Sequence, residues 1–385
     1  MSRPRYGEGT IRQRADGRWE CAFQDPRYNN GKRKSIYGKT EQEVKKKLKE
    51  LKRKIETSTI SGNSKVTFET YFSHWMVNRK KKELKPASYD RLETTFRYHI
   101  APEIGKKQLV NLNPDDIQQL IDRKADTGLS HSSVKKIYDA INACLKYAVI
   151  RRDIPFNPAE AVTLGRDPGD MGKVKYYTEE EAKQIIAQAT AKNGAGSLIF
   201  RLGYAIPLLL NTGLRAGELL ALRWGEDVDL TKRIVYIRHN MVMVKNRDPD
   251  SDKKYILLDQ NSTKTQRGER SLYLNDVAYN ALLELKKVTG NSKYVMSSIR
   301  YKPINATNLD RMFKAICVRC GFPEDKIYGV HALRHTFASR LLQKGVDIKV
   351  ISDALGHADT KITYNTYIHL SEDQRRKAVE IINEI

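Results

Sequence analysis

The sequence predicts a multidomain α+β protein built from three consecutive blocks, and three observations lead to that prediction. The chain has 385 residues, which is more than one ordinary domain holds. Two segments with linker composition, 58–64 and 165–175, interrupt it. The hydrophobic pattern changes along the chain from alternation to a helical period and then to a mixture of both. We therefore expect a small sheet with one helix, an all-helical domain, and a mainly helical domain containing a small antiparallel sheet.

Residues 1–57 predict a three-stranded sheet packed on one helix. The alternating pattern of strands occurs in Gly9–Arg14, Arg18–Gln24 and Lys32–Tyr37, and Asp-Gly and Asn-Asn-Gly turn signals separate them. A capping box at Thr40–Glu43 starts a helix with a single apolar stripe. That stripe can cover the apolar face of the sheet, which is formed by Ile11, Trp19, Cys21, Phe23 and Ile36.

The opposite face of this sheet is expected to be basic. Residues 1–65 hold 18 basic and 8 acidic side chains, a net charge of +10. Because a small basic sheet can enter a DNA groove as a ribbon, we predict DNA binding by this face. The alternative is an ordinary solvated surface. The candidate DNA-binding residues are Arg12, Arg14, Arg18, Arg33 and Tyr37.

The second block, residues 66–160, is predicted to be all-helical. Thr67–Asn78 is amphipathic, Asn113–Asp116 caps a second helix with proline in its first turn, and Ser133–Ile150 forms a third. The third block starts at another capping box, Thr178–Glu181. We expect helices there, then strands at Arg233–Ile237, Tyr255–Leu258 and Arg270–Leu274, then helices to the end of the chain.

The amino-acid composition indicates which class of molecule the protein binds and in which environment it acts. There are 69 basic and 46 acidic residues, giving a net charge of +23, which favours nucleic acid over a merely basic soluble protein. The longest apolar stretch, 198–210, is interrupted by Arg201 and Pro207, so we expect no membrane segment. The N-terminus lacks the apolar run of a signal peptide, and four cysteines do not make a disulfide scaffold. We therefore expect a protein of the reducing cytoplasm.

The third block carries polar residues that suit phosphodiester transfer. They stand in Thr212–Glu218 (TGLRAGE), in Ser262–Arg270 (which reads as a hairpin tip bearing Lys264), in His331–Arg334 (HALR), and at His357 and Tyr367. Each motif has an ordinary structural explanation by itself. Together they supply guanidinium forks for non-bridging oxygens, a tyrosine nucleophile, and an ammonium group that can protonate a leaving oxygen.

In combination these residues resemble the tyrosine recombinases, in particular the integrases of phages and conjugative transposons. The resemblance is carried by TGLRAGE at 212–218, TKT at 263–265, HALRHTFA at 331–338, LGH at 355–357 and NTYIH at 365–369. It implies an arm-site DNA-binding domain at 1–57, a helical SAM-like core-binding domain at 66–160, and a catalytic domain with the tyrosine recombinase fold at 175–385.

The resemblance also implies a reaction and a role for six residues. The expected protein is a site-specific recombinase that cuts and rejoins DNA through a 3′-phosphotyrosine intermediate, integrating and excising a mobile element without metal or ATP. The implied roles are nucleophile for Tyr367, phosphate clamp for Arg215 and Arg334, general acid for Lys264, proton transfer for His331, and a hydrogen bond to phosphate for His357.

No cofactor or metal is expected. The sequence contains neither a P-loop nor an Asp/Glu cluster of the two-metal nuclease type. Asp248–Asp252 lacks the glycine and terminal glutamate of a calcium loop, so we expect a loop between strands. Cys317 and Cys320 form one C-x-x-C pair without a second, inside a helical run, and are expected in the core.

A helix is predicted at 371–385, where a capping box precedes an apolar stripe of Ala378, Ile381, Ile382 and Ile385. The stripe can pack on its own domain or, as the resemblance implies, on a neighbouring protomer. The expected partners are double-stranded DNA from the element ends and target site, three further copies of the chain in a homo-tetramer on DNA, and an excision factor.

Three alternatives differ from this interpretation. The first is a related enzyme, a chromosome-dimer resolvase or a type IB topoisomerase, and the extra N-terminal block disfavours the resolvase. The second is a DNA-binding regulator without catalysis, which would not need a tyrosine at that spacing. The third is a metal-dependent nuclease, which a chelator would inactivate.

Overall fold

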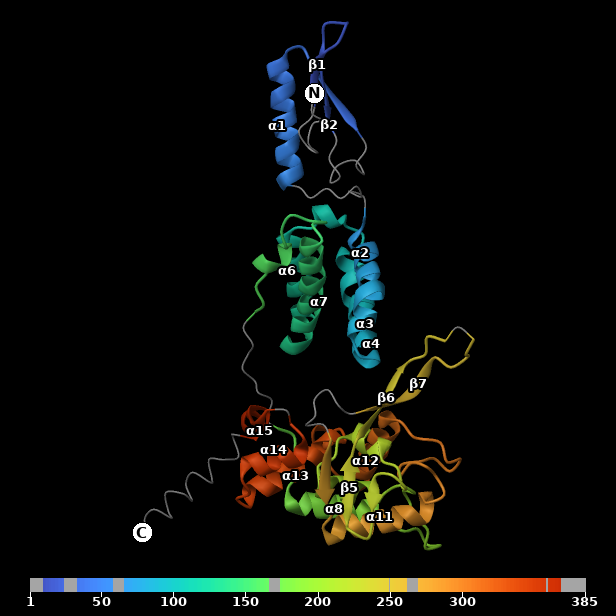
Figure 1. Cartoon of the computed structure of the whole chain (residues 1–385). Coiled ribbons are helices and arrows are strands. Elements are labelled where there is room, and N and C mark those ends of the chain that lie inside the picture. Colours follow the sequence, from blue (N-terminus) through green and yellow to red (C-terminus); the bar gives the residue numbers. More distant parts are fainter. Residues whose placement is uncertain are drawn as a thin grey trace, which may run out of the picture. The chain divides into compact units, whose positions relative to one another are not determined.

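The computed structural model describes residues 10–23, 33–57, 66–165, 174–248, 250–261, 269–357 and 359–367 (Figure 1). Of these, residues 52–57, 261, 365 and 367 are described by their backbone alone. The chain divides into two compact units, residues 1–169 and 170–385.

The first unit begins with a three-stranded antiparallel sheet of order β1-β2-β3. Its strands are β1 (Thr10–Gln13), β2 (Trp19–Phe23) and β3 (Lys34–Gly38). In the register, Arg12 lies opposite Glu20, and Glu20 lies opposite Tyr37. One face packs on α1 (Glu41–Thr57), where Cys21, Phe23, Val44 and Leu48 form the buried centre. The predicted apolar face is therefore confirmed, and alternation leaves Arg12, Glu20 and Tyr37 on the other face.

The rest of the first unit is helical. One long helix consists of α2 (Phe68–Trp75), the π-helical turn η2 (Met76–Lys80) and α3 (Lys81–Glu83). A second consists of α4 (Pro86–Thr95), the π-helical turn η3 (Phe96–Ile100) and α5 (Ala101–Ile104). The 3₁₀ turn η4 (Leu109–Asn111), α6 (Pro114–Asp126), α7 (His131–Ile150) and the 3₁₀ turn η5 (Pro158–Ala161) follow.

Aromatic side chains form the centre of this helical core. The ring of Phe72 stacks on that of Phe96, with centroids 4.2 Å apart, and meets Trp75 edge to face. The stack joins the first long helix to the second, since Phe72 lies in α2 and Phe96 in η3. Asn113 caps α6 as predicted, and Asp116 returns the hydrogen bond to make the cap reciprocal.

The second unit is mainly helical. Its first three helices are α8 (Glu179–Ala189), α9 (Ala205–Thr212) and α10 (Ala216–Ala221). After the strands come α11 (Asp276–Thr289), α12 (Ala306–Arg319) and the 3₁₀ turn η7 (Glu324–Lys326). The last described helices are α13 (His331–Gln343), α14 (Ile348–Leu355) and α15 (Thr360–Tyr367).

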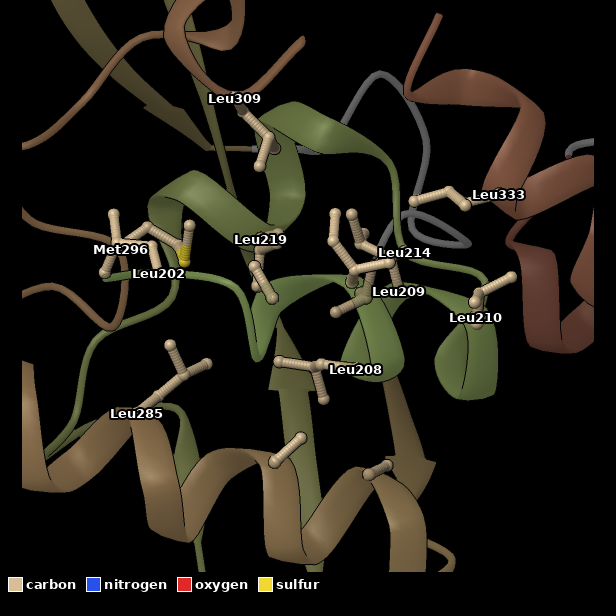
Figure 2. Packing of buried hydrophobic residues seen from close by; sticks show 14 of the residues in the cluster. Leu202, Leu208, Leu209, Leu210, Leu214, Leu219, Leu285, Met296, Leu309 and Leu333 are labelled. Atoms are coloured by element: carbon tan, nitrogen blue, oxygen red, sulfur yellow. The ribbon is translucent and has the colours of Figure 1, made fainter. Parts of the chain in front are cut away.

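Leucine side chains from distant parts of the sequence form the core of this unit (Figure 2). Leu208 and Leu209 of α9 and Leu219 of α10 are buried among Leu285 of α11 and Leu309 of α12. Removing this much apolar surface from water fixes α9 and α10 in place. The short turn between these two helices is therefore a rigid element on which polar groups can be positioned.

Among the described residues of the second unit, five strands form two small antiparallel sheets. The first has the order β4-β5-β8, with β4 (Val228–Asp229), β5 (Ile234–Ile237) and β8 (Arg270–Tyr273). The second pairs β6 (His239–Lys245) with β7 (Tyr255–Asn261). The expected mixture of helices and a small antiparallel sheet is confirmed.

The strand pairing corrects one detail of the sequence interpretation. Ser262–Arg270 was expected at a hairpin tip, which would pair the strands on either side of it. In the described residues β7 pairs with β6 and β8 pairs with β5, so the segment between them connects two sheets. The strand that pairs with β7 is β6, and β6 was not predicted from the sequence.

No helix among the described residues is long and apolar enough to cross a bilayer.

Candidate active site

The turn between α9 and α10 places the first arginine of the site. Gly213 ends α9 with a φ of 64°, in the left-handed region that favours glycine. A Cβ at this position would lie 2.4 Å from Cδ1 of Phe337 in α13 and 3.0 Å from Cδ2 of Leu355 in α14. The turn therefore packs directly against both helices, and Arg215, which follows it, is directed toward the end of α14.

Arg215 is held by Glu218 and leaves part of its guanidinium accessible. Its NH1 donates to Oε1 of Glu218 at 2.8 Å, and its backbone N–H donates to Oε2 at 2.9 Å. NH1 and NH2 also make long contacts of 3.4 Å to the carbonyl oxygens of Leu355 and Gly356. The side chain is 39% exposed, so an anion can still reach the guanidinium.

Arg334 lies close to Arg215, although 119 positions separate them in the sequence. Its NH2 donates to the carbonyl oxygen of Leu355 at 2.7 Å, and its NH1 donates to that of Gly213 at 2.8 Å. Arg334 is only 3% exposed. Both guanidiniums thus share one carbonyl acceptor at the end of α14, and the structure brings the two predicted clamp residues together.

His331 starts the helix that carries Arg334. Desolvation by the surrounding protein, and then the charges of Arg334 and Arg215, hold the pKa of His331 below its usual value. The ring of His331 meets that of His335 edge to face, with centroids 4.8 Å apart. At neutral pH His331 is therefore uncharged and able to accept a proton.

His357 follows the C-terminal end of α14, where Gly356 has a φ of 67°. Its Nδ1 lies 2.7 Å from Oγ1 of Thr363 in α15, a fully buried hydroxyl. Burial, and then the charges of Arg334, Arg215 and Arg270, lower the pKa of His357 to about 4. The imidazole is consequently neutral and fixed in orientation, with Nε2 left as its second hydrogen-bonding atom.

The two remaining predicted catalytic residues are described incompletely or not at all. Tyr367 is the last residue of α15, and its side chain is not described. It lies four residues after Thr363, so the helical period places both on one face of α15. Lys264 belongs to 262–268, outside the described residues.

Arg270 joins this group, and the sequence analysis did not select it. Its NH1 and NH2 donate to the two oxygens of Glu218 at 3.1 and 2.8 Å, and its Nε donates to the carbonyl of Ala354 at 3.0 Å. Burial alone would raise the pKa of Glu218, but Arg270 and then Arg215 outweigh it and lower this pKa to about 2. An open hollow of ≈ 710 Å³ adjoins Arg270 and His357.

The candidate DNA-binding face of the N-terminal sheet surrounds a carboxylate that the sequence analysis did not single out. Glu20 is 5% exposed and accepts hydrogen bonds from Arg12 at 2.9 Å and Tyr37 at 3.3 Å. Arg14 lies 3.7 Å from the same carboxylate, and Arg18 pairs with Asp16 at 2.7 Å. Arg33 is exposed before β3. The structure thus brings three of the five candidates together around Glu20.

No group of three or more metal-ligating side chains occurs in the part of the chain that the structure describes. Asp248 and Asp250–Asp252 lie in the connection between β6 and β7, as expected. Cys317 is buried in α12 with its sulfur 3.5 Å from the Tyr177 hydroxyl, so the C-x-x-C pair belongs to the core as predicted.

Family models match two segments of this sequence. Residues 175–374 match the model of the phage integrase family, and residues 67–125 match that of the phage integrase N-terminal SAM-like domain. A tyrosine recombinase XerC-like protein of Caldanaerobacter subterraneus subsp. tengcongensis is 28% identical, over 93% of this chain and 94% of the relative.

Solved structures of integrases share this fold. The Tn1549 transposon integrase in complex with transposon right end DNA has a TM-score of 0.67 and 22% identity, over 82% of this chain and 99% of that chain. A lambda integrase tetramer bound to a Holliday junction has a TM-score of 0.57 and 18% identity, over 91% of this chain and 96% of that chain.

Proposed function

The chain belongs to the phage integrase family, and from this premise we propose that it is a site-specific DNA recombinase that integrates and excises a mobile genetic element. It is a tyrosine recombinase, and its reaction passes through a 3′-phosphotyrosine intermediate. The observation that carries the proposal is the convergence of Arg215 and Arg334 on the Leu355 carbonyl, beside His357 and the helix of Tyr367.

In the proposed cleavage step, the Tyr367 hydroxyl oxygen attacks the scissile phosphorus. A bond forms between that oxygen and phosphorus, and the bond from phosphorus to the 5′ oxygen breaks. His331 takes the tyrosine proton, and Lys264 gives a proton to the departing 5′ oxygen. The phosphotyrosine conserves the bond free energy, so a 5′ hydroxyl can reverse the step and reseal the strand without ATP.

The proposed roles of the cationic and neutral groups follow from their environments. As the transition state forms, negative charge grows on the non-bridging oxygens, and the two guanidinium forks stabilise it. A neutral His331 can act as a base because its pKa lies below the usual value. A neutral His357 that accepts from Thr363 at Nδ1 carries its proton on Nε2 and can donate it to the phosphate.

The proposal assigns the charge stabilisation to protein cations, so no cofactor takes part. We assign catalysis to residues 175–385, core-site DNA binding to residues 66–160 and arm-site DNA binding to residues 1–57, where the proposed contacts are Arg12, Arg14, Arg18, Arg33 and Tyr37. The proposed substrate is double-stranded DNA from the element ends and the target site. The proposed place of action is the bacterial cytoplasm, on the nucleoid, with an excision factor as a further partner.

The function is tested by covalent trapping. The wild-type protein should form a protease-sensitive adduct on nicked DNA carrying a candidate element end, in EDTA, because no step needs a metal ion. Denaturing gels measure the adduct. An adduct that appears only after magnesium is added would support the metal-dependent nuclease instead. Tight binding without any adduct on a series of element ends would support a non-catalytic DNA-binding protein.

The proposed assembly is a homo-tetramer on DNA, closed by residues 371–385 of each protomer, which lie outside the described residues. The lambda integrase neighbour is a tetramer on a Holliday junction. Deletion of 371–385 should abolish tetramer formation on junction DNA, measured by sedimentation, and leave binding to one site unchanged. Ile382→Ser should weaken assembly, whereas Glu380→Ser, on the opposite face of the predicted helix, should not. If the truncated protein still forms tetramers, residues 371–385 do not close the assembly.

A further inference from the structure

Within the proposed function, we propose that Arg270 is a positioning residue of the phosphate clamp. Arg270 binds the buried carboxylate of Glu218, and the Arg215 guanidinium therefore stays directed toward the substrate phosphate. Arg270 also connects the end of α14, which His357 follows, to the same carboxylate. The inference depends on the proposed recombinase function, since it assigns a role within that reaction.

The geometry shows that Arg270 acts through protein groups. Its side chain is 9% exposed, and each of its three guanidinium nitrogens has a protein acceptor. Two nitrogens bind Glu218 side by side, which is the most favourable geometry for an arginine and a carboxylate. Arg270 is therefore a fixed part of the site's scaffold.

Glu218 serves two arginines at the same time. Its Oε1 accepts from NH1 of both Arg215 and Arg270, and its Oε2 accepts from NH2 of Arg270 and the backbone N–H of Arg215. Because Arg270 already neutralises this carboxylate, the guanidinium of Arg215 contributes only its NH1 to it. Without Arg270, the buried negative charge would attract the whole Arg215 guanidinium, which would then be less available to a phosphate.

The second contact of Arg270 reaches the segment that carries His357. Its Nε donates to the carbonyl of Ala354, in the last turn of α14. A Cβ on Gly356 would lie 2.7 Å from NH1 of Arg270, so the guanidinium packs directly against the backbone that precedes His357. Arg270 thus connects β8, α10 and the end of α14, three elements that contribute to the site.

Arg270→Gln tests the proposal in the full-length protein on nicked DNA. The variant should bind DNA like the wild type and form the covalent adduct about 10²-fold more slowly, the usual effect of misplacing a reacting group by about 1 Å. Arg270→Lys keeps the charge but cannot make both sets of contacts, so its rate should lie in between. Arg233→Gln is the matched control, because it removes an exposed arginine–aspartate pair beside the same sheet.

A methylphosphonate substrate separates positioning from a general loss of structure. It carries a methyl group in place of one charged non-bridging oxygen, so the clamp has less charge to stabilise. Both Arg270→Gln and Arg215→Lys should lose less cleavage rate, relative to the wild type, on this substrate than on the ordinary phosphodiester. A deficit of equal size on both substrates would overturn the inference.

Two further outcomes would also overturn it. Wild-type cleavage by Arg270→Gln would show that Arg215 needs no such support. A 5′-bridging phosphorothiolate has a leaving sulfur that needs no proton. If this substrate restored cleavage by Arg270→Gln, the loss of rate would be due to the proton donor and not to the phosphate clamp. If Arg270→Gln does not fold, as judged by thermal unfolding, the comparison is made with Arg270→Lys. A wild-type protein that forms no adduct would instead contradict the proposed function itself.

Discussion

We expect the Tyr367→Phe variant to bind element-end DNA as tightly as the wild-type protein and to form no covalent adduct with it. The substitution removes one oxygen atom, which is the proposed nucleophile, and leaves the phenyl ring. Loss of a nucleophile lowers the cleavage rate by about 10⁶-fold in well-studied hydrolases, so the adduct should be undetectable on a denaturing gel.

Tyr364 supplies the matched control for this experiment. It lies three residues before Tyr367 in α15 and is an exposed tyrosine. Tyr364→Phe should form the adduct at the wild-type rate, since the face shared with Thr363 is unchanged. An adduct that persists in Tyr367→Phe and disappears in Tyr364→Phe would show that the nucleophile is wrongly assigned.

The second large effect is expected for Arg215→Lys. The lysine keeps the positive charge, but a single ammonium cannot bind Glu218, the end of α14 and a phosphate in the geometry of the guanidinium. Loss of one preorganised donor to a charged transition state lowers the rate by about 10²- to 10³-fold. Single-turnover cleavage of nicked DNA at saturating protein measures this step separately from binding.

Arg233→Lys is the control for the arginine-to-lysine change itself. Arg233 pairs with Asp276 at 2.6 Å on an exposed surface, so the exchange should leave cleavage unchanged. Equal rates in Arg215→Lys and the wild type would contradict the clamp assignment. A matching loss in Arg233→Lys would mean that the measurement reports general charge or stability.

The local sequence pattern predicted the local features of the fold. The reciprocal caps at Asn113 and Thr178 and the apolar face of the N-terminal sheet depend on neighbouring residues, and the structure contains them. Strand β6 was missed because its buried residues, Met241 and Val244, are three positions apart. Such spacing gives no alternating signal.

The predicted site residues came from motifs, and their arrangement required the structure. Arg270 has its carboxylate partner 52 positions earlier, so no local pattern connects the two. Glu20 is another example, since its environment comes from residues on both neighbouring strands. For Arg270, its alternation in phase with the buried Leu272 of β8 is the signal that could have pointed to such a pair.

The three arginines also cap the C-terminal end of α14. The carbonyl oxygens of Ala354, Leu355 and Gly356 accept hydrogen bonds or long contacts from Arg270, Arg334 and Arg215. These carbonyls form the negative end of the helix dipole, which positive side chains stabilise. Arg215 and Arg334, which would bind the scissile phosphate, therefore also complete a helix together with Arg270. Consequently, fold stability alone restricts which residues these three positions accept, even in a protein that never cuts DNA.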